Sequence, residues 1–244
     1  AAIQKAVDSG KITIPFVQKS RTAGYDGKGV FVVNSADKLK NMMDCPSVVE
    51  DLVDIDKELA VIAVRNAEGE INTFPIVEME FHPTANLVEF LLAPAEVDVL
   101  IEEKCKNLAI ELVDKLDICG LLAVELFLTK SGAILINEVA PRPHNSGHHT
   151  IESCSSSQFE QHIRGILNMP LSDIVQLSPA VMVNLLGADG HTGEAIYPGF
   201  DTCISESNVY PHLYGKVQTK PFRKMGHITL TDQDREKAKK KAKF

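Results

Sequence analysis

The sequence predicts an α+β fold, with helices packed on antiparallel sheets and a small β domain at the C-terminal end. Between residues 48 and 92, β-branched and apolar runs alternate with turn residues, a pattern typical of antiparallel strands. Residues 95–116 carry apolar side chains three and four positions apart, which predicts a helix with one buried face. After residue 178, short strand-like runs alternate with Gly and Pro turns. We therefore expect one domain over 1–178 and a second over 179–244.

Local signals place the individual elements. A first helix ends at Gly10, and β-branched runs at 12–19 and 30–33 predict two strands. Ser35 is a suitable N-cap for a short helix. Four further runs, expected to form an antiparallel sheet, are VVEDLV, KELAVIAVR, INTFPIVEME and NLVEFLL.

The second half of the chain predicts helices on that sheet and a hairpin. The helix over 95–116 should lie across the sheet, because its apolar stripe needs a partner. The runs LLAVELFL and AILINEVA flank the turn residues 129–132 and predict a β-hairpin. Ser157 followed by Glu160 is a capping-box pattern that opens a helix ending before Pro170. The charged residues 234–244 predict a terminal helix or a frayed tail.

Composition and charge limit the classes of partner. The 244 residues carry a formal net charge of -8, which argues against broad binding of nucleic acid or of anionic membranes. A small phosphorylated ligand needs only a few local cations. The five cysteines are odd in number and lack metal-ligand spacing, which is typical of free thiols, and we expect a cytoplasmic protein. No apolar run reaches membrane-spanning length, and the start at Ala1 inside an expected helix suggests a truncated N-terminus.

The segment GYDGKG at 24–29 is a candidate anion-binding loop. Its three glycines allow the backbone to fold tightly around anionic oxygens, and Lys28 supplies positive charge. The spacing matches neither a Walker loop nor a dinucleotide-binding fingerprint. A glycine-rich turn with exposed polar residues is the alternative interpretation.

The hairpin predicts a pair of facing carboxylates. A two-residue turn at Ser131 and Gly132 would set Glu125 directly opposite Glu138 on one face. Two like charges with Cβ atoms roughly 5 Å apart are unfavourable unless a cation neutralises them, and magnesium suits such oxygen ligands. The alternative is a solvated hairpin face. Apolar neighbours, those at 134–136 among them, favour burial on both faces instead.

A loop dense in hydrogen-bond donors and stiffened by two prolines follows the second glutamate. Arg142 can grip a phosphate or bicarbonate through its planar guanidinium, and His144 and Asn145 add hydrogen bonds. The histidines of this loop lack a cysteine partner and a clear ligand spacing, which argues against zinc. Its serine does not lie in a nucleophile-elbow pattern.

Nearly the whole chain resembles the 5-(carboxyamino)imidazole ribonucleotide synthetases, a branch of the ATP-grasp superfamily. The resemblance rests on the segments GYDGKG, INEVAPRPHNSGHHT, SQFEQHIRG, MVNLLG and RKMGHIT. It implies the ATP-grasp fold, with ATP and Mg2+ as cofactors. Members of this family begin with a further domain that is absent here. We therefore expect the chain alone to be weakly active or inactive.

The resemblance also implies a role for each candidate residue. It places Lys19 and Lys28 on the ATP phosphates, Glu50 and Val53 beside adenine, Glu58 on the ribose, and magnesium between Glu125 and Glu138. Bicarbonate and the imidazole ribonucleotide would meet Tyr25, Asp26, Arg142, His144 and Asn145, with Asp26 accepting the proton of the amine. The phosphate of the ribonucleotide would meet Lys216, Arg223 and Lys224. The catalytic candidates are Asp26, Lys28, Arg142, His144 and Asn145.

The implied reaction attaches bicarbonate to an amine in purine biosynthesis. Bicarbonate would attack the γ-phosphate of ATP to give carboxyphosphate, which carboxylates the amine of 5-aminoimidazole ribonucleotide. The resemblance favours a homodimer. Ala140 stands where many ATP-grasp enzymes have Asn, so the number of magnesium ions stays open. Two other interpretations remain: another ATP-grasp carboxylate-amine ligase, or a nucleotide-binding fragment without turnover.

Overall fold

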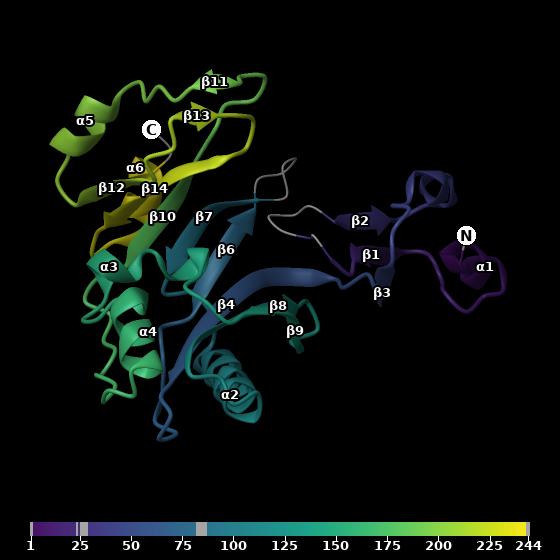
Figure 1. Cartoon of the computed structure of the whole chain (residues 1–244), viewed down its shortest axis with the longest axis horizontal. Coiled ribbons are helices and arrows are strands. Elements are labelled where there is room, and N and C mark those ends of the chain that lie inside the picture. Colours follow the sequence, from purple (N-terminus) through teal and green to yellow (C-terminus); the bar gives the residue numbers. More distant parts are fainter. Residues whose placement is uncertain (1, 23, 25–28, 82–86, 243–244) are drawn as a thin grey trace. The chain divides into compact units, whose positions relative to one another are not determined.

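A computed structural model describes residues 2–22, 24, 29–81 and 87–242 of the chain (Figure 1). The chain divides into two compact units. The first comprises Ala1–Asp54 with His82–Leu87, and the second comprises Ile55–Phe81 with Val88–Phe244. Helices and antiparallel strands occur in both units, and the α+β fold class is confirmed.

The first unit is a three-stranded antiparallel sheet with short helices. Strand β1 lies between β2 and β3. The expected short helix is a 3-10 helix, and Ser35 caps it without a side-chain hydrogen bond. The unit's elements are α1 (Ala2–Asp8), β1 (Phe16–Ser20), β2 (Val30–Val33), η1 (Ala36–Asn41) and β3 (Ser47–Asp51).

One strand assignment was wrong. The run VVEDLV was expected in the same sheet as the runs that follow it, but it forms β3 and pairs with β1. Strand pairing depends on distant partners, and hydropathy within a run carries no information about them. The buried side-chain amide of Gln18 in β1 also connects this strand to the segment before β3. It forms hydrogen bonds with the backbone N–H and C=O of Met43, each at 2.9 Å.

The second unit is built on a sheet of nine strands within the described residues. The path through it is β12-β14-β10-β7-β6-β4-β8-β9, and β5 pairs with β4. The run INTFPIVEME divides into β5 and β6, because Pro75 cannot donate a backbone hydrogen bond. The strands are β4 (Ile55–Arg65), β5 (Ile71–Thr73), β6 (Val77–Phe81), β7 (Val88–Ala93), β8 (Gly120–Thr129), β9 (Ile134–Ala140), β10 (Ala180–Leu186), β12 (Val209–Leu213) and β14 (Lys224–Thr231).

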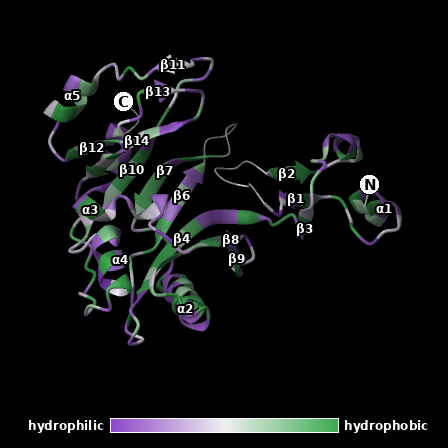
Figure 2. Ribbon diagram, viewed as in Figure 1, coloured by the Kyte–Doolittle hydropathy of each residue, from purple (hydrophilic) through white to green (hydrophobic). Residues whose placement is uncertain are grey.

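Helix α2 (Val99–Lys115) covers one face of this sheet, as its periodicity predicted. Cys105, Ala109 and Val113 are fully buried against the apolar side chains of β4 and β8. Asp98 begins the helix, since its side chain accepts a hydrogen bond from the backbone of Leu100 at 2.8 Å. Figure 2 shows hydrophobic residues along the central part of β4.

Helix α4 (Gln158–Ile166) packs on β8, whose Leu121 and Ala123 belong to a second apolar cluster. A Cβ added to Gly165 would lie 2.9 Å from the Cα of Gly120, so only glycine permits this close approach. Ser157 caps the helix by accepting a hydrogen bond from the backbone of Glu160 at 3.2 Å. The 3-10 turn η2 (Asn145–Gly147) and the short helix α3 (Thr150–Ser153) precede it.

The C-terminal region continues the same sheet. Strand β10 pairs with β7 on one side and with β14 on the other, so strands from before and after residue 179 belong to the same sheet. The remaining elements are β11 (Gly193–Glu194), α5 (Phe200–Ser205), β13 (Gln218–Thr219) and the expected terminal helix α6 (Arg235–Lys241). Within the described ranges, no helix has the length and apolar character needed to cross a membrane.

Candidate active site

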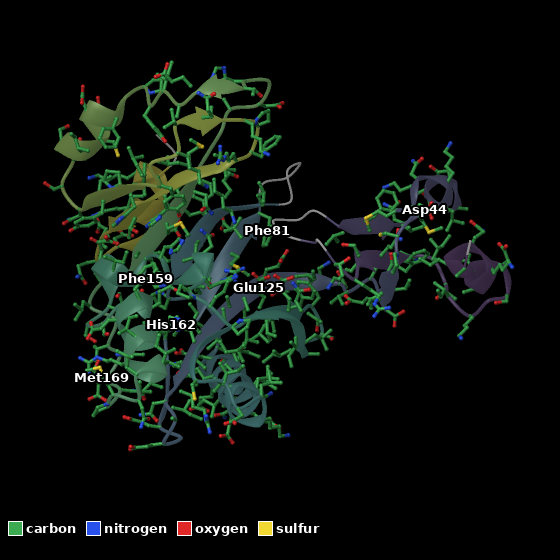
Figure 3. The ribbon with its side chains drawn as sticks, viewed as in Figure 1. Asp44, Phe81, Glu125, Phe159, His162 and Met169 are labelled. Atoms are coloured by element: carbon green, nitrogen blue, oxygen red, sulfur yellow. The ribbon has the colours of Figure 1, made fainter. Side chains whose placement is uncertain are left out.

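The two faces of β8 have different surroundings. Leu122, Val124 and Leu126 point to α2, so the residues between them belong to the opposite face. That opposite face is apolar near Ala123 and becomes acidic at Glu125, which Figure 3 labels. Because β4 pairs with β8, Glu58 lies on the acidic part as well, opposite Phe127. The alternation of the strand thus gathers carboxylates at one end of a buried surface.

Glu125 and Glu138 are direct partners in the β8–β9 ladder, as predicted. Burial, together with the negative charges of Glu138 and Glu58, raises the pKa of Glu125 to about 7. An amide hydrogen bond from Asn137 at 3.4 Å and the charge of Lys224 act in the opposite direction. Burial alone raises the pKa of Glu58 to about 7. This cluster therefore favours a proton or a cation.

The route to this pairing differs from the expected one. The turn contains three residues, because the backbone N–H of Thr129 donates to the carbonyl of Ala133 and Gly132 has a φ of +81°. A register shift beside Glu125 then adds one residue on β9. The extra residue in the turn and the extra residue on β9 therefore compensate for each other, and Glu125 still pairs with Glu138. Burial on both faces was also wrong, since the β9 residues Leu135 and Ile136 are exposed at the sheet edge.

His144 lies above Glu125, with its Nε2 3.4 Å from the carboxylate Oε1. The backbone N–H of Ser146 donates to its Nδ1 at 3.3 Å. Because a backbone N–H can only donate, Nδ1 carries no proton in this arrangement. The ring therefore directs its Nε2–H toward Glu125.

Asn145 is fixed by a reciprocal amide pair with Asn184 of β10. Each side chain donates one hydrogen bond to the other, at 2.8 and 3.0 Å. Asn184 is buried and also donates to the backbone oxygen of Val88 at 2.9 Å. Arg142 is exposed in the same loop, and its guanidinium donates to the carbonyl of Pro143 at 3.1 Å. An exposed guanidinium is suited to binding an anion.

Two of the three C-terminal cations lie next to each other. The Lys216 ammonium donates to the backbone oxygen of Lys224 at 2.5 Å and lies 5.3 Å from the ring centre of Tyr214. Lys224 is close enough to lower the pKa of Glu125. Arg223 instead donates to the carbonyl of Gln218 at 2.6 Å. The structure thus brings Lys224 to the acidic cluster from a strand far along the sequence.

Three residues expected to bind nucleotide belong to the first unit. Lys19 of β1 forms an ion pair with Glu50 of β3 at 2.7 Å, across adjacent strands. Val53 follows β3 in an irregular segment and is half-buried. The predicted residues Tyr25, Asp26 and Lys28 lie outside the described residues.

The donor set at the acidic cluster fits magnesium. Glu125 and Glu138 offer only oxygen atoms, and their mutual repulsion is relieved by a divalent cation. Within the part of the chain that the structure describes, no three His, Cys, Asp or Glu side chains converge on one point. Two carboxylates leave coordination positions for water and phosphate oxygens, which Mg2+ retains readily.

Sequence reasoning assigned no role to a column of stacked rings beside the loop. The ring of His148 lies 4.7 Å from that of His227, which lies 4.5 Å from that of His212. Burial lowers the pKa of His148 to about 4 and that of His227 to about 3. The segments NSGHHT and RKMGHIT were noted as sequence signals, but their pairing is a tertiary contact. Two hydrogen bonds hold these rings. One joins the Tyr214 hydroxyl and Nδ1 of His227 at 3.0 Å, and the other joins Oε1 of Glu152 and Nε2 of His212 at 2.6 Å.

The family models agree with this geometry. The model of the ATP-grasp domain matches residues 2–159, and that of the phosphoribosylaminoimidazole carboxylase C-terminal domain matches residues 180–241. The chain belongs to the ATP-grasp family.

Similar proteins narrow the class further. The chain is 41% identical over 227 residues to the N5-carboxyaminoimidazole ribonucleotide synthase of Bacillus subtilis, covering 91% of this chain and 58% of that protein. The N5-carboxyaminoimidazole ribonucleotide synthetase of Thermotoga maritima superposes with a TM-score of 0.87 at 42% identity, covering 96% and 62% of the two chains. A synthase of Aspergillus clavatus, solved with ADP and 5-aminoimidazole ribonucleotide, gives 0.86 at 34% identity, covering 98% and 64%. The chain thus spans about three fifths of the length of these relatives.

Proposed function

We propose that the protein carries out the ATP- and bicarbonate-dependent carboxylation of 5-aminoimidazole ribonucleotide. The observation that carries this proposal is the acidic pair of the half-buried Glu125 and the exposed Glu138, with His144 above it and Lys224 beside it. Such a cluster suits a metal-bound nucleotide phosphate next to a small anion. The likeness to relatives named as synthases of this product supports the choice of substrate.

The proposed reaction has two steps. An oxygen of bicarbonate attacks the γ-phosphorus of ATP, the bond from that phosphorus to the β-phosphate oxygen breaks, and ADP leaves. The resulting carboxyphosphate then transfers its carboxyl carbon to the exocyclic amine, releasing inorganic phosphate and one proton. Asp26 is the proposed acceptor of that proton. Water must be excluded, because carboxyphosphate hydrolyses readily.

Each site residue has a proposed role that follows from the group it would contact. Glu125 and Glu138 would hold Mg2+, which when bound neutralises charge on the phosphates. Arg142, His144 and Asn145 would orient bicarbonate and the amine, together with Tyr25 and Asp26. Lys216, Arg223 and Lys224 would bind the phosphate of the ribonucleotide. The nucleotide itself would meet Lys19, Lys28, Glu50, Val53 and Glu58.

The oligomeric state, the cellular location and the division into domains are part of the same proposal. We propose a homodimer in the cytoplasm, for which the free thiols of all five cysteines are a suitable state. We also retain the division into regions 1–178 and 179–244, which the separate family matches support.

Phosphate release by the full-length protein tests the proposal. With ATP and Mg2+, release should require bicarbonate, and 5-aminoimidazole ribonucleotide, when present, should be converted into the carbamate of its exocyclic amine. Formate in place of bicarbonate serves as the control and should give no product. Release that formate sustains, or release with another amine acceptor only, would instead identify a different ATP-grasp ligase.

A further inference from the structure

Gln158 is the first residue of α4 and is completely buried. Its Oε1 accepts a hydrogen bond from the backbone N–H of His144, and its Nε2 donates to the backbone oxygen of His144, both at 2.8 Å. The second Nε2 proton points to Nδ1 of His148 at 3.1 Å. The amide is therefore fully used, and two of its three bonds hold a single residue.

This contact fixes the direction in which His144 points. The backbone of His144 is extended, with φ -122° and ψ 152°, and the Gln158 amide pairs with it as a neighbouring strand would. The ring is held separately by the N–H of Ser146 on Nδ1. With backbone and ring both fixed, the Nε2–H is aimed at Glu125.

The backbone of Gln158 is itself held in place by a hydrogen bond to the preceding loop. Its backbone N–H donates to the hydroxyl of Thr150 at 2.9 Å, and that hydroxyl donates to the carbonyl of Gly147 at 2.6 Å. A Cβ on Gly147 would lie 2.6 Å from the Gln158 amide, so the loop passes against this side chain without spare room. The start of α4 and the loop over 144–150 thus form one hydrogen-bonded unit.

We infer that Gln158 is a positioning residue for the carboxylation reaction, because its amide holds the backbone of His144 so that the imidazole stays directed at the acidic pair. This inference rests on the proposed function. Gln158 itself touches no reacting atom. Misplacing a group by about 1 Å can cost on the order of 100-fold in rate, so the loss of this clamp should be visible in kinetics.

Two substitutions test the clamp, and a neighbouring glutamine provides the control. Gln158→Glu keeps the acceptor for the His144 N–H but loses both donated bonds, whereas Gln158→Met keeps the length and loses all three. Gln161 lies one turn further along α4 and is also completely buried, but its amide bonds Ser156 and Ser172 instead. Gln161→Glu therefore repeats the chemical change without touching the loop.

The decisive measurement is kcat/KM for 5-aminoimidazole ribonucleotide in two backgrounds, well below the thermal midpoint of each variant. We expect Gln158→Glu to lose about 10-fold and Gln158→Met up to about 100-fold when His144 is present. In the His144→Ala background neither should cause further loss, because no ring remains to be oriented. Equal losses in both backgrounds, or no loss in either, would overturn the inference. Gln161→Glu should behave identically in the two backgrounds.

Hydrogen exchange at the His144 backbone N–H supplies a readout that needs no turnover. This proton should be protected in the wild-type protein and in Gln161→Glu, and should exchange at least about 10-fold faster in Gln158→Met, which removes its acceptor. Fast exchange in the wild-type protein contradicts the clamp. Absence of carboxylation by the wild-type protein would count against the proposed function alone, while the exchange data would still decide whether the clamp exists.

Discussion

Glu125 and Glu138 are opposite each other because a three-residue turn and an added residue at 137 shift the ladder by equal and opposite amounts. Next to the turn, Leu128 pairs with Ile134, one position away from the register of a two-residue turn. The shift beside Glu125 restores that register from the glutamates onward, through the pair of Ala123 and Ala140. A strand displaced by one residue presents the other face, so this irregularity decides whether the two carboxylates meet.

The first prediction concerns the proposed magnesium ligands. Glu138→Gln keeps the size of the side chain and removes its charge, so magnesium-dependent phosphate release should weaken by about 100-fold or more, given that even outer-shell partners are worth about 10–100-fold. A magnesium titration of phosphate release in the full-length protein measures this. Without metal, the variant should be up to about 1 kcal/mol more stable, because two opposed like charges are no longer both present.

Glu125→Gln should show the same loss, and Glu103→Gln on the exposed side of α2 should show none. If both variants in the acidic pair keep a wild-type magnesium titration, the metal assignment fails.

The second prediction separates geometry from charge at Arg142. Arg142→Lys keeps the positive charge but loses the planar pair of donors, so kcat/KM should fall about 10- to 100-fold, as for a charged hydrogen bond worth about 1.5–3 kcal/mol. The control is Arg164→Lys, since Arg164 also donates to a proline carbonyl at 3.1 Å but lies on α4. Wild-type kinetics for Arg142→Lys would show that the guanidinium only braces the loop.

The third prediction concerns the amide pair that joins β10 to the loop. Asn184→Ala leaves the Asn145 side chain and the carbonyl of Val88 without their partner, and this should lower the free energy of unfolding by about 1–3 kcal/mol. Urea unfolding measures the loss. Asn107→Ala on the exposed face of α2 should change stability little. An unchanged midpoint for Asn184→Ala would mean that solvent replaces the pair without cost.

The fourth prediction follows from the buried histidines. The folded-state pKa values of His148 and His227 are about 4 and about 3, below the ordinary 6.5, so the unfolded chain binds protons that the folded chain does not. The stability that these histidines contribute should therefore be complete above about pH 6.5 and fall as the pH drops toward 4, by up to about 1.4 kcal/mol per pH unit for each histidine. Glu58 and Glu125 act in the opposite direction between about pH 4.5 and 7, because burial raises their folded-state pKa values to about 7, so the slope of each histidine is read from its own variant. The fully buried His149, with a pKa of about 3, adds to this slope.

Urea unfolding at several pH values between 7 and 5 measures that slope. His227→Phe keeps a ring in the column and should flatten the slope by the share of one histidine. His191→Gln, at an exposed position, should leave it nearly unchanged. A slope that His227→Phe does not alter would assign the pH dependence to other groups.

The sequence predicted features with a local cause and missed those that depend on distant contacts. The buried stripe of α2 and the cap at Ser157 follow from spacing within one helix, and both are present. The facing glutamates were also predicted, although the assumed turn was wrong and the added residue compensated for it. No local pattern distinguishes a two-residue from a three-residue turn at Ser131 and Gly132.

The missed residues share a different property. The buried amide of Asn184 forms hydrogen bonds with Asn145, 39 positions away. The buried amide of Gln158 forms hydrogen bonds with His144, 14 positions away. Polar residues in a strand or at a helix start are common, and only the tertiary fold reveals what they bond. The same reason explains β3, which pairs with β1 although β2 lies between the two strands along the sequence.

The pairing of β10 with both β7 and β14 has a consequence for dissecting the chain. Removing residues 179–244 would leave the backbone groups of β7 from Phe90 to Ala93 without their ladder partners. It would also uncover the buried side chains of Leu91 and Leu92. An exposed, apolar edge strand recruits other strands, so the shortened chain should self-associate even if its remaining core folds correctly. The C-terminal segment therefore also acts as a cover that keeps the sheet from aggregating.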